Sequence, residues 1–345
     1  DSISKMTVPQ IGPEELAQVL KSTITARLPL LITGMPGIGK TEITKQICEK
    51  LKIRYIIFHP VISDPTDFKG MPWVVSEGGK FHGYFIPFAE LQLMTETEEP
   101  LVVVFDDLGQ APSMVQAAIM QFLLERKLNM TAIKDGVTFV AATNRKKDKA
   151  AVTGILEPVK SRFATIVELV ADQKAWRKWA MQAGLSKILI AFIDFRPELL
   201  CAFKPTSDFT NSPVPRTIEN LDKLIKLDLP VQCRAAAYAG AVGMGFTREY
   251  LAFEQMYRDL KQINIIPENP ESVPVPTKPD VKYAIVNALV NLTEKDNIVN
   301  IMAWIGKLPI EFQALYVSDI ETMKNKLVET RPIIDWKIEH GSLRI

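Results

Sequence analysis

A phosphate-binding loop pattern restricts the fold of this chain more than any other feature of its sequence. Residues 34–41 read Gly-Met-Pro-Gly-Ile-Gly-Lys-Thr, a complete G-x-x-x-x-G-K-[ST] pattern. A β-branched apolar run at 28–33 precedes it and a helical pattern at 40–51 follows it, which is the context that such a loop requires. By average residue usage, roughly one chain in a hundred of this length carries the pattern by accident, and the required flanks make an accident rarer. The pattern therefore predicts nucleotide binding.

The residues of the loop have separate expected roles. Glycines let backbone N–H groups curl around phosphate oxygens, and the N-terminus of the following helix adds a positive field. We expect Lys40 to reach the β- and γ-phosphates and the Thr41 hydroxyl to bind Mg²⁺. The expected phosphate-binding residues are Gly34, Met35, Pro36, Gly37, Ile38, Gly39, Lys40, Thr41 and Glu42.

Two acidic residues support the same prediction. The run at 101–105 is apolar on both faces, as in a central strand covered by helices, and Asp106 and Asp107 follow it. Ligand sites of parallel sheets form at the carboxyl ends of the strands. We expect Asp106 to hold the Mg²⁺ hydration shell and Asp107 to polarise the attacking water. Alone, this pair would be an ordinary strand-to-loop boundary; beside a complete phosphate loop it is a candidate metal and catalytic site.

Strands and helices alternate in the first half of the chain, which predicts βαβ units and a parallel α/β sheet flanked by helices. Predicted strands cover residues 28–33, 54–58, 101–105, 137–142 and 165–169. Predicted helices cover 40–51, 113–128, 172–183, 186–195, 217–227, 231–241, 247–261, 280–292, 296–305 and 318–329. We expect an ATPase-like core at 1–171, a helical lid at 172–229 and a helical C-terminal region at 230–345. Five prolines at 267–279 predict an extended linker inside that last region.

Composition narrows the function classes. Lysine and arginine number 41 against 40 aspartates and glutamates, so a dedicated non-specific nucleic-acid binder, which usually has a broad basic surface, is disfavoured. Three separated cysteines and three histidines suit neither a disulfide framework nor a histidine-rich metal site. The longest uncharged apolar stretch, 235–246, is shorter than the roughly 18 residues that span a bilayer, and residues 1–5 begin no signal-peptide pattern. We expect a cytoplasmic protein with no membrane span.

Several motifs together resemble an AAA+ ATPase core, and their order most resembles the MoxR or dynein-related branch. Besides the loop and the acidic pair, the chain reads Asp-Leu-Gly-Gln-Ala-Pro at 107–112, Ala-Thr-Asn-Arg at 142–145, Leu-Glu-Pro-Val-Lys-Ser-Arg-Phe at 156–163 and Val-Pro-Arg-Thr at 214–217. The resemblance covers about residues 10–230. It implies a P-loop sheet followed by an all-helical lid, with ATP and Mg²⁺ as cofactors.

The resemblance also implies roles for three residues outside the loop. Asn144 is similar to the first sensor, which orients water against the γ-phosphate. Arg162 is similar to the arginine finger, which acts across a subunit boundary, and Arg216 is similar to the second sensor on the lid. A plainer interpretation makes Arg162 a surface arginine and Arg216 a helix-start residue after Pro215. With Asp107, these three are the expected catalytic residues.

The chain departs from the family pattern at Asp107, where the family usually has glutamate. The missing methylene shortens the reach of the carboxylate by about 1.5 Å. Asp107 therefore predicts either slow hydrolysis or a loop that lies closer to the phosphate.

Two further segments each have two interpretations. An aromatic-rich insert at 64–85 contains a predicted hairpin around Gly78 and Gly79. In one interpretation the insert faces the central pore of a ring or a partner protein, and in the other the aromatic residues of the hairpin pack on the body of the domain. The basic run from Arg145 to Lys149 is either a solvated loop or part of a subunit interface.

The resemblance implies an ATPase that forms a hexameric ring, hydrolyses ATP with Mg²⁺ at a subunit interface, and remodels or matures a partner protein, as a chaperone does. MoxR-like ATPases commonly work with a partner that carries a von Willebrand factor A domain. Two alternatives stay open: an AAA+ loader that acts on nucleic acid, which the balanced charge disfavours, and a nucleotide-gated scaffold with little turnover.

Overall fold

The computed structural model describes residues 8–148 and 154–341, which form two compact units. Within these residues, the first unit runs to Asp172 and takes in Phe203–Ser207. The second unit consists of Gln173–Ala202 and the described residues from Asp208 onward. Lys149 of the basic run and the opening residues 1–5 lie outside the described residues. None of the helices in the described ranges is both long and apolar enough to cross a bilayer.

The first unit is built on a six-stranded parallel sheet with the order β1-β10-β2-β9-β6-β3. Its strands are β1 (Gln10–Ile11), β2 (Leu30–Gly34), β3 (Arg54–Phe58), β6 (Leu101–Phe105), β9 (Val137–Asn144) and β10 (Thr165–Leu169). The predicted parallel α/β class is confirmed. β9 continues beyond its predicted end at residue 142, so Asn144 is its last residue and lies opposite Gly34 in the ladder. The strand that precedes the glycine-rich loop and the strand that ends in Asn144 are therefore neighbours.

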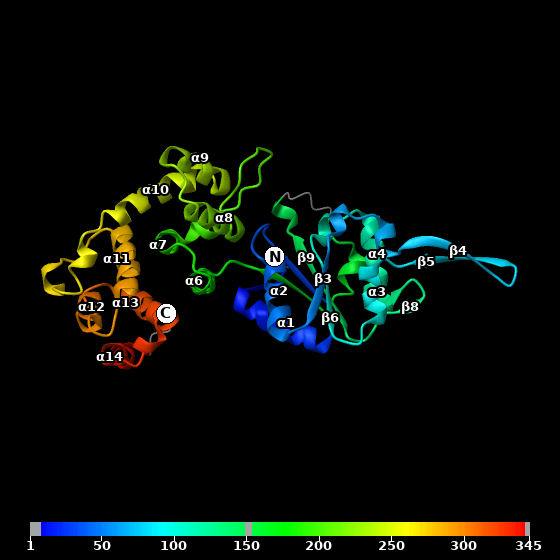
Figure 1. Cartoon of the computed structure of the whole chain (residues 1–345), viewed down its shortest axis with the longest axis horizontal. Helices are drawn as coiled ribbons and strands as arrows, with labels where there is room; N and C mark the ends of the chain where they lie inside the picture. The colour runs from blue at the N-terminus through cyan, green and yellow to red at the C-terminus, as the bar shows by residue number, and fades with distance from the viewer. Residues whose placement is uncertain (1–7, 149–153, 342–345) are drawn as a thin grey trace, which may run out of the picture. The chain divides into compact units, whose positions relative to one another are not determined.

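Helices cover both faces of this sheet (Figure 1). One face carries α1 (Pro13–Ala26) and α2 (Lys40–Leu51), and the other carries α3 (Ala89–Glu96) and α4 (Ser113–Glu125). On the α3–α4 face, a chain of stacked and edge-on rings fills the core; its members are Phe58, Phe68, Phe105, Phe122 and Phe139. Apolar burial on both faces explains why these strands read as continuous apolar runs.

The helix predicted over 113–128 is wrong at its C-terminal end. α4 ends at Glu125 because Arg126 adopts a left-handed backbone with φ of 52°. The Arg126 guanidinium donates to the carbonyls of Val137 (2.8 Å) and Lys134 (2.7 Å). The chain then forms a short hairpin of β7 (Lys127–Leu128) and β8 (Thr131–Ala132).

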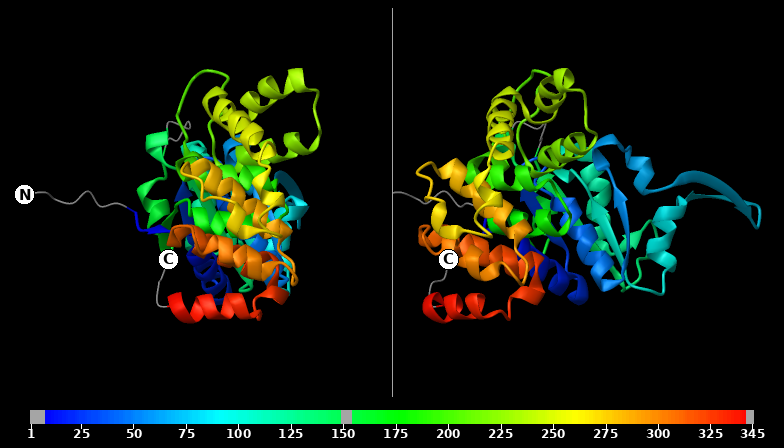
Figure 2. Two further views of the ribbon diagram at one scale, coloured as in Figure 1. Left: turned by 90° about the vertical axis from the view of Figure 1, so that its left-hand side faces the viewer. Right: turned by 60° about the vertical axis from the view of Figure 1, so that its left-hand side comes forward.

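A second hairpin, predicted around Gly78 and Gly79, is confirmed. β4 (Met71–Glu77) and β5 (Lys80–Ile86) pair antiparallel, and both turn glycines have positive φ, 57° and 79°. A two-residue turn of this kind matches the twist of the strands. The hairpin extends away from α3 and α4 (Figure 1, and the right-hand view of Figure 2). Trp73 is 55% exposed and Phe81 80% exposed, so the interpretation that its aromatic residues pack on the domain is wrong.

The second unit is helical and has one hydrophobic core. Its helices are α6 (Gln173–Gln182), α7 (Lys187–Phe195), α8 (Pro215–Lys226), α9 (Val231–Val242), α10 (Met244–Arg258), α11 (Pro279–Leu292), α12 (Ile298–Ile305), α13 (Ile310–Met323) and α14 (Arg331–His340). Residues from both sides of position 230 share the core, such as Phe192, Leu221 and Trp304. Arg177 of α6 lies inside it and pairs with Asp194 of α7 and Asp319 of α13.

Two helical-region predictions need correction. The helix predicted over 318–329 is wrong: α13 starts at Ile310 and ends at Met323, and α14 starts only at Arg331. The predicted extended linker at 267–279 is wrong in part: Pro267 lies in a turn at 265–268, a 3-10 turn follows at Pro270–Ser272, and Pro279 is the first residue of α11. Val273, directly after the 3-10 turn, is buried and its carbonyl accepts a hydrogen bond from Trp304 Nε1 at 2.9 Å, so this part of the linker packs on α12 instead of crossing open surface.

Candidate nucleotide-binding site

The phosphate loop joins the end of β2 to the start of α2. Gly37 and Gly39 adopt φ of 77° and 103°, a region that residues with a Cβ rarely occupy. Gly34 has an ordinary φ, but a Cβ there would lie 3.0 Å from the carbonyl oxygen of Leu169 on β10. The glycines of the pattern are therefore required by backbone conformation and by close packing against the neighbouring strand.

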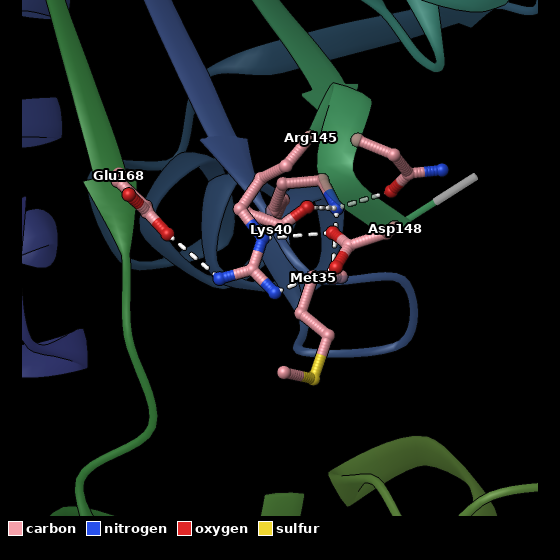
Figure 3. A network of polar contacts seen from close by, with 7 residues as sticks. Met35, Lys40, Arg145, Asp148 and Glu168 are labelled. Atoms are coloured by element: carbon pink, nitrogen blue, oxygen red, sulfur yellow. Dashed lines mark hydrogen bonds and ion pairs between the residues drawn. The ribbon is translucent and has the colours of Figure 1, made fainter. Parts of the chain in front are cut away.

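Lys40, the first residue of α2, is only 6% exposed. Its ammonium donates to the carbonyls of Gly34 (3.2 Å) and Met35 (3.1 Å) and to Oδ1 of Asn144 (2.8 Å). Figure 3 shows the Lys40 side chain turned back over the loop, with Met35 beside it. The predicted phosphate-binding lysine and the predicted first sensor therefore lie in direct contact.

Thr41 and Asp106 form the second contact that the sequence predicts. The Thr41 hydroxyl donates to Oδ1 of Asp106 at 2.7 Å, and Nδ1 of His59 lies 3.8 Å from the other carboxylate oxygen. A hydroxyl and a carboxylate are hard oxygen donors, which Mg²⁺ prefers, and Mg²⁺ usually takes one or two protein ligands together with phosphates and water. The pair fits Mg²⁺ in that mode. No cluster of at least three His, Cys, Asp or Glu residues suited to a metal occurs in the described part of the chain.

Asp107 and Asn144 lie together with a residue that the sequence analysis did not assign to the site, Gln110. Asp107 has a left-handed backbone, φ 55°, and the 3-10 turn Leu108–Gln110 follows it. Nδ2 of Asn144 donates to Oε1 of Gln110 at 3.2 Å and faces Oδ1 of Asp107 at 3.4 Å. Asn144 is therefore held between the lysine of the loop and the turn that follows β6.

Arg145 is a second residue whose place in the site was not predicted. The interpretation of the basic run as a solvated loop is wrong for Arg145, because its guanidinium donates twice to Asp148 (2.7 Å each) and once to Glu168 of β10 (2.9 Å). The hydrogen bonds to Asp148 and then Glu168 raise the pKa of Arg145 above its ordinary value, against the effect of burial. Figure 3 shows this network beside Lys40. Lys146 and Lys147 of the same run are exposed.

The remaining predicted site residues are not drawn into these contacts. Arg162 is exposed on the turn between α5 (Glu157–Lys160) and β10. Arg216 is exposed near the start of α8, in the other unit. Glu42 is exposed and lies 3.8 Å from Lys45.

Spacing explains which residues were found and which were missed. The predicted residues that the structure brings together belong to the contiguous loop or lie at the end of a recognisable strand, whereas Arg162 and Arg216 do neither. Gln110 reaches Asn144 through the 3-10 turn that follows the left-handed Asp107, and Arg145, which follows β9, meets Glu168 of β10 although β2 lies between the two strands. The one indication in the sequence is the spacing: Gln110 lies three residues after Asp107, the distance that a single 3-10 turn spans.

A phosphate loop on a parallel sheet, with the Thr41–Asp106 pair and the Asn144 amide at the same strand ends, defines a P-loop nucleotide-binding domain. Residues 30–169 match the sequence model of the ATPase family associated with various cellular activities (AAA). This part of the chain is similar to AAA ATPase domains. Comparison with curated proteins finds no match.

Solved structures give more distant likenesses. The Holliday junction branch migration motor RuvB of Thermotoga maritima is 15% identical, with 84% of each chain covered and a TM-score of 0.39. NtrX of Brucella abortus is 13% identical, with 89% of this chain and 67% of NtrX covered and a TM-score of 0.41. NtrX in complex with ADP gives 15% identity, 72% and 67% coverage, and a TM-score of 0.36. At these TM-scores the likeness carries no inference about substrate or partner.

Proposed function

We propose that the chain is a cytoplasmic ATPase that binds ATP with Mg²⁺ at the phosphate loop and hydrolyses it. One observation carries this proposal: the Thr41 hydroxyl lies 2.7 Å from Asp106 while Lys40, one residue earlier, lies 2.8 Å from Asn144. The side chains proposed to bind the metal, the phosphates and the attacking water thus lie together at the carboxyl ends of β2, β6 and β9.

Each of these groups has a task in the proposed reaction. Lys40 moves from its carbonyl and amide partners to the β- and γ-phosphates, and Thr41 and Asp106 hold Mg²⁺, which neutralises phosphate charge. Asp107 polarises the attacking water, and Asn144 orients that water against the γ-phosphorus. The water oxygen bonds to the γ-phosphorus and one of its protons passes to an oxygen of the phosphate, while the bond from the γ-phosphorus to the β–γ bridging oxygen breaks, and ADP and inorganic phosphate leave.

We further propose that the chain works in a hexameric ring of the MoxR-like kind, with Arg162 completing the site of the neighbouring subunit. The Arg162 guanidinium is exposed, as a residue that acts in another subunit must be. A guanidinium at the transferring phosphoryl group contributes about 10³-fold or more in rate. Arg216 is proposed to report the nucleotide state from α8 of the helical unit.

The β4–β5 hairpin supports a role on a partner protein. It exposes aromatic and aliphatic side chains on both of its faces, including Trp73, Val74, Phe81 and Tyr84. Contiguous exposed apolar surface marks interaction sites on soluble domains. We propose that the ring remodels or matures a client, and that an adaptor with a von Willebrand factor A domain presents this client.

A mixing experiment tests the ring ATPase directly. Lys40→Ala and Arg162→Ala should each lose turnover with Mg²⁺ and ATP, the first because it cannot hold the phosphates and the second because the neighbouring site lacks its guanidinium. Mixed in equal amounts, the two variants should regain part of the activity, because some interfaces then pair an intact Lys40 with an intact Arg162. Particle mass should be recorded in the same samples.

Arg54→Ala is the matched control, because Arg54 is an exposed arginine of β3 outside the proposed machinery. It should hydrolyse ATP at the parent rate. Failure of the mixture to regain activity, with both variants folded, would reject catalysis in trans. Tight ATP binding by the parent with no turnover at any protein concentration would instead support a nucleotide-gated scaffold, and stimulation by DNA would support the loader alternative.

A further inference from the structure

We infer that Gln110 is a positioning residue of this site, which holds the Asn144 amide in the orientation that the proposed reaction needs. The inference rests on the proposed ATP hydrolysis and adds a residue that the phosphate-loop and sensor patterns do not include.

The backbone at Asp107 places Gln110 where it lies. β6 ends at Phe105, the N–H of Asp106 still donates to the Phe58 carbonyl at 2.9 Å, and Asp107 then turns left-handed at φ 55°. The N–H of Gln110 donates to the Asp107 carbonyl at 3.0 Å, which closes the 3-10 turn. Aspartate enters the left-handed region more readily than most residues that carry a Cβ. The short acidic residue and the returning glutamine therefore belong to one local arrangement.

The two ends of the Asn144 amide face groups of opposite character. Oδ1 accepts from the Lys40 ammonium at 2.8 Å, and Nδ2 donates to Gln110 Oε1 at 3.2 Å and faces Asp107 Oδ1 at 3.4 Å. A flipped amide would turn its N–H groups toward the ammonium and its oxygen toward two acceptors. The ammonium, which only donates, and the Asp107 carboxylate, which only accepts, select this orientation, and the Gln110 oxygen accepts the second N–H of the amide in it.

Two of those partners have other tasks in the proposed reaction. Lys40 moves to the phosphates when the nucleotide binds, and Asp107 turns to the attacking water. Gln110 is the partner of Nδ2 that remains to hold the amide while the water is oriented. The Asn144 oxygen then faces the space that Lys40 leaves, where the water and the γ-phosphate meet.

The test is a double-mutant cycle between Gln110 and Asn144. Gln110→Met keeps the length of the side chain but removes the acceptor, so kcat should fall about tenfold, the worth of one well-placed hydrogen bond, while KM and the Kd for ATP change less than twofold. Gln110→Ala should give the same pattern, which guards against a packing effect of methionine. In an Asn144→Ala background, measured by single turnover, Gln110→Met should have no further effect.

Gln92→Met is the control, because Gln92 is an exposed glutamine of α3 whose side chain bonds Glu96; its kcat should equal that of the parent. Equal turnover of the parent and Gln110→Met would overturn the inference while leaving the ATPase intact. A tenfold loss that persists in the Asn144→Ala background would also overturn it, because Gln110 would then act independently of the amide. Absence of turnover in the parent itself, with ATP bound, would reject the proposed hydrolysis together with the inference.

Discussion

Left-handed backbone at single residues gives the nucleotide site its shape. Gly37 and Gly39 bend the phosphate loop, and Asp107 turns the chain after β6 so that Gln110 reaches the sensor. A positive φ is cheap for glycine, tolerable for aspartate and costly for most other residues. The placement of the side chains in the site therefore depends on the backbone conformation of these three residues.

Gly39→Ala tests this dependence. The substitution places a Cβ on a residue with φ of 103°, so the first unit should lose about 1–2 kcal/mol of stability and ATP affinity should fall. Gly240→Ala is the matched control, because Gly240 lies inside α9 with open space around the added Cβ; it should stabilise the second unit by about 0.5–1 kcal/mol. Differential scanning calorimetry measures both, and a shift of the same sign in the two variants would contradict the explanation.

Residues whose roles follow from local sequence could be predicted, and residues whose roles follow from tertiary contact could not. Lys40 and Thr41 belong to a contiguous pattern, and Asp106 follows an obvious strand. Arg145 looked like a member of a solvated basic run because its partner Glu168 lies 23 positions away and only the sheet brings them together. The same reason hid Gln110.

At the scale of elements, the apolar pattern predicted the existence of strands better than the ends of helices. β3, β6 and β10 have the predicted bounds because each is a short run rich in apolar and β-branched residues, and β6 is apolar and buried along its whole length. The predicted helix over 113–128 was too long because its residue types do not indicate that Arg126 adopts a left-handed backbone and ends the helix. The helix over 318–329 was misplaced because α13 buries residues from Phe312 to Ile320, a pattern that begins well before position 318.

α2 should resist chemical probes although it carries a thiol. Cys48 is fully buried on this helix, and burial, with a smaller effect of the Glu49 charge, raises its pKa to about 11. Since the thiolate is the reactive form, timed alkylation at pH 8 should modify the exposed Cys233 first and Cys48 only when α2 opens locally. Because α2 starts at the phosphate loop, ATP should slow the modification of Cys48 further.

Peptide mass spectrometry after each interval gives the two rates. Cys233 serves as the internal control, because it lies in the other unit and its rate should not respond to ATP. Modification of Cys48 at the rate of Cys233 would contradict the burial of α2, and an ATP effect of equal size on both thiols would indicate a change in the whole chain instead of this helix.

At the scale of the whole molecule, the core of the helical unit buries two carboxyl groups beside one guanidinium, so the possible charges of this cluster do not balance. One guanidinium, that of Arg177, serves the carboxylates of Asp194 and Asp319 inside a hydrophobic core. Burial raises the pKa of Asp319 to about 7, against the lowering effect of Arg177. We therefore expect the folded unit to bind a proton at Asp319 more readily than an unfolded aspartate does.

The stability of the second unit should accordingly fall with rising pH. The pKa of Asp319 is higher in the folded chain than its ordinary value of 3.8, so the folded state binds more protons between about pH 4 and pH 7. Its stabilising contribution is complete below pH 4, declines across this window and is lost above pH 7. Urea unfolding followed by tryptophan fluorescence reports this unit, because every tryptophan except Trp73 lies in it.

Asp319→Asn is the reference for that measurement, since asparagine does not titrate. The free energy of unfolding of the parent minus that of Asp319→Asn should decrease from pH 4 to pH 7 and then become constant. A difference that grows with pH would mean that the charge of Arg177 outweighs burial, and would reverse the assignment.

The β4–β5 hairpin also sets a condition on how this protein can be handled. Both of its strands are edge strands, because the sheet contains no others, and unpaired backbone groups on an apolar strand are a template for pairing with another chain. Two molecules that meet through these ribbons can extend each other's sheet without unfolding. We expect this short segment to limit the concentration at which the purified protein stays monodisperse, and charged substitutions at its exposed apolar positions, such as Val74 and Phe81, to raise that concentration.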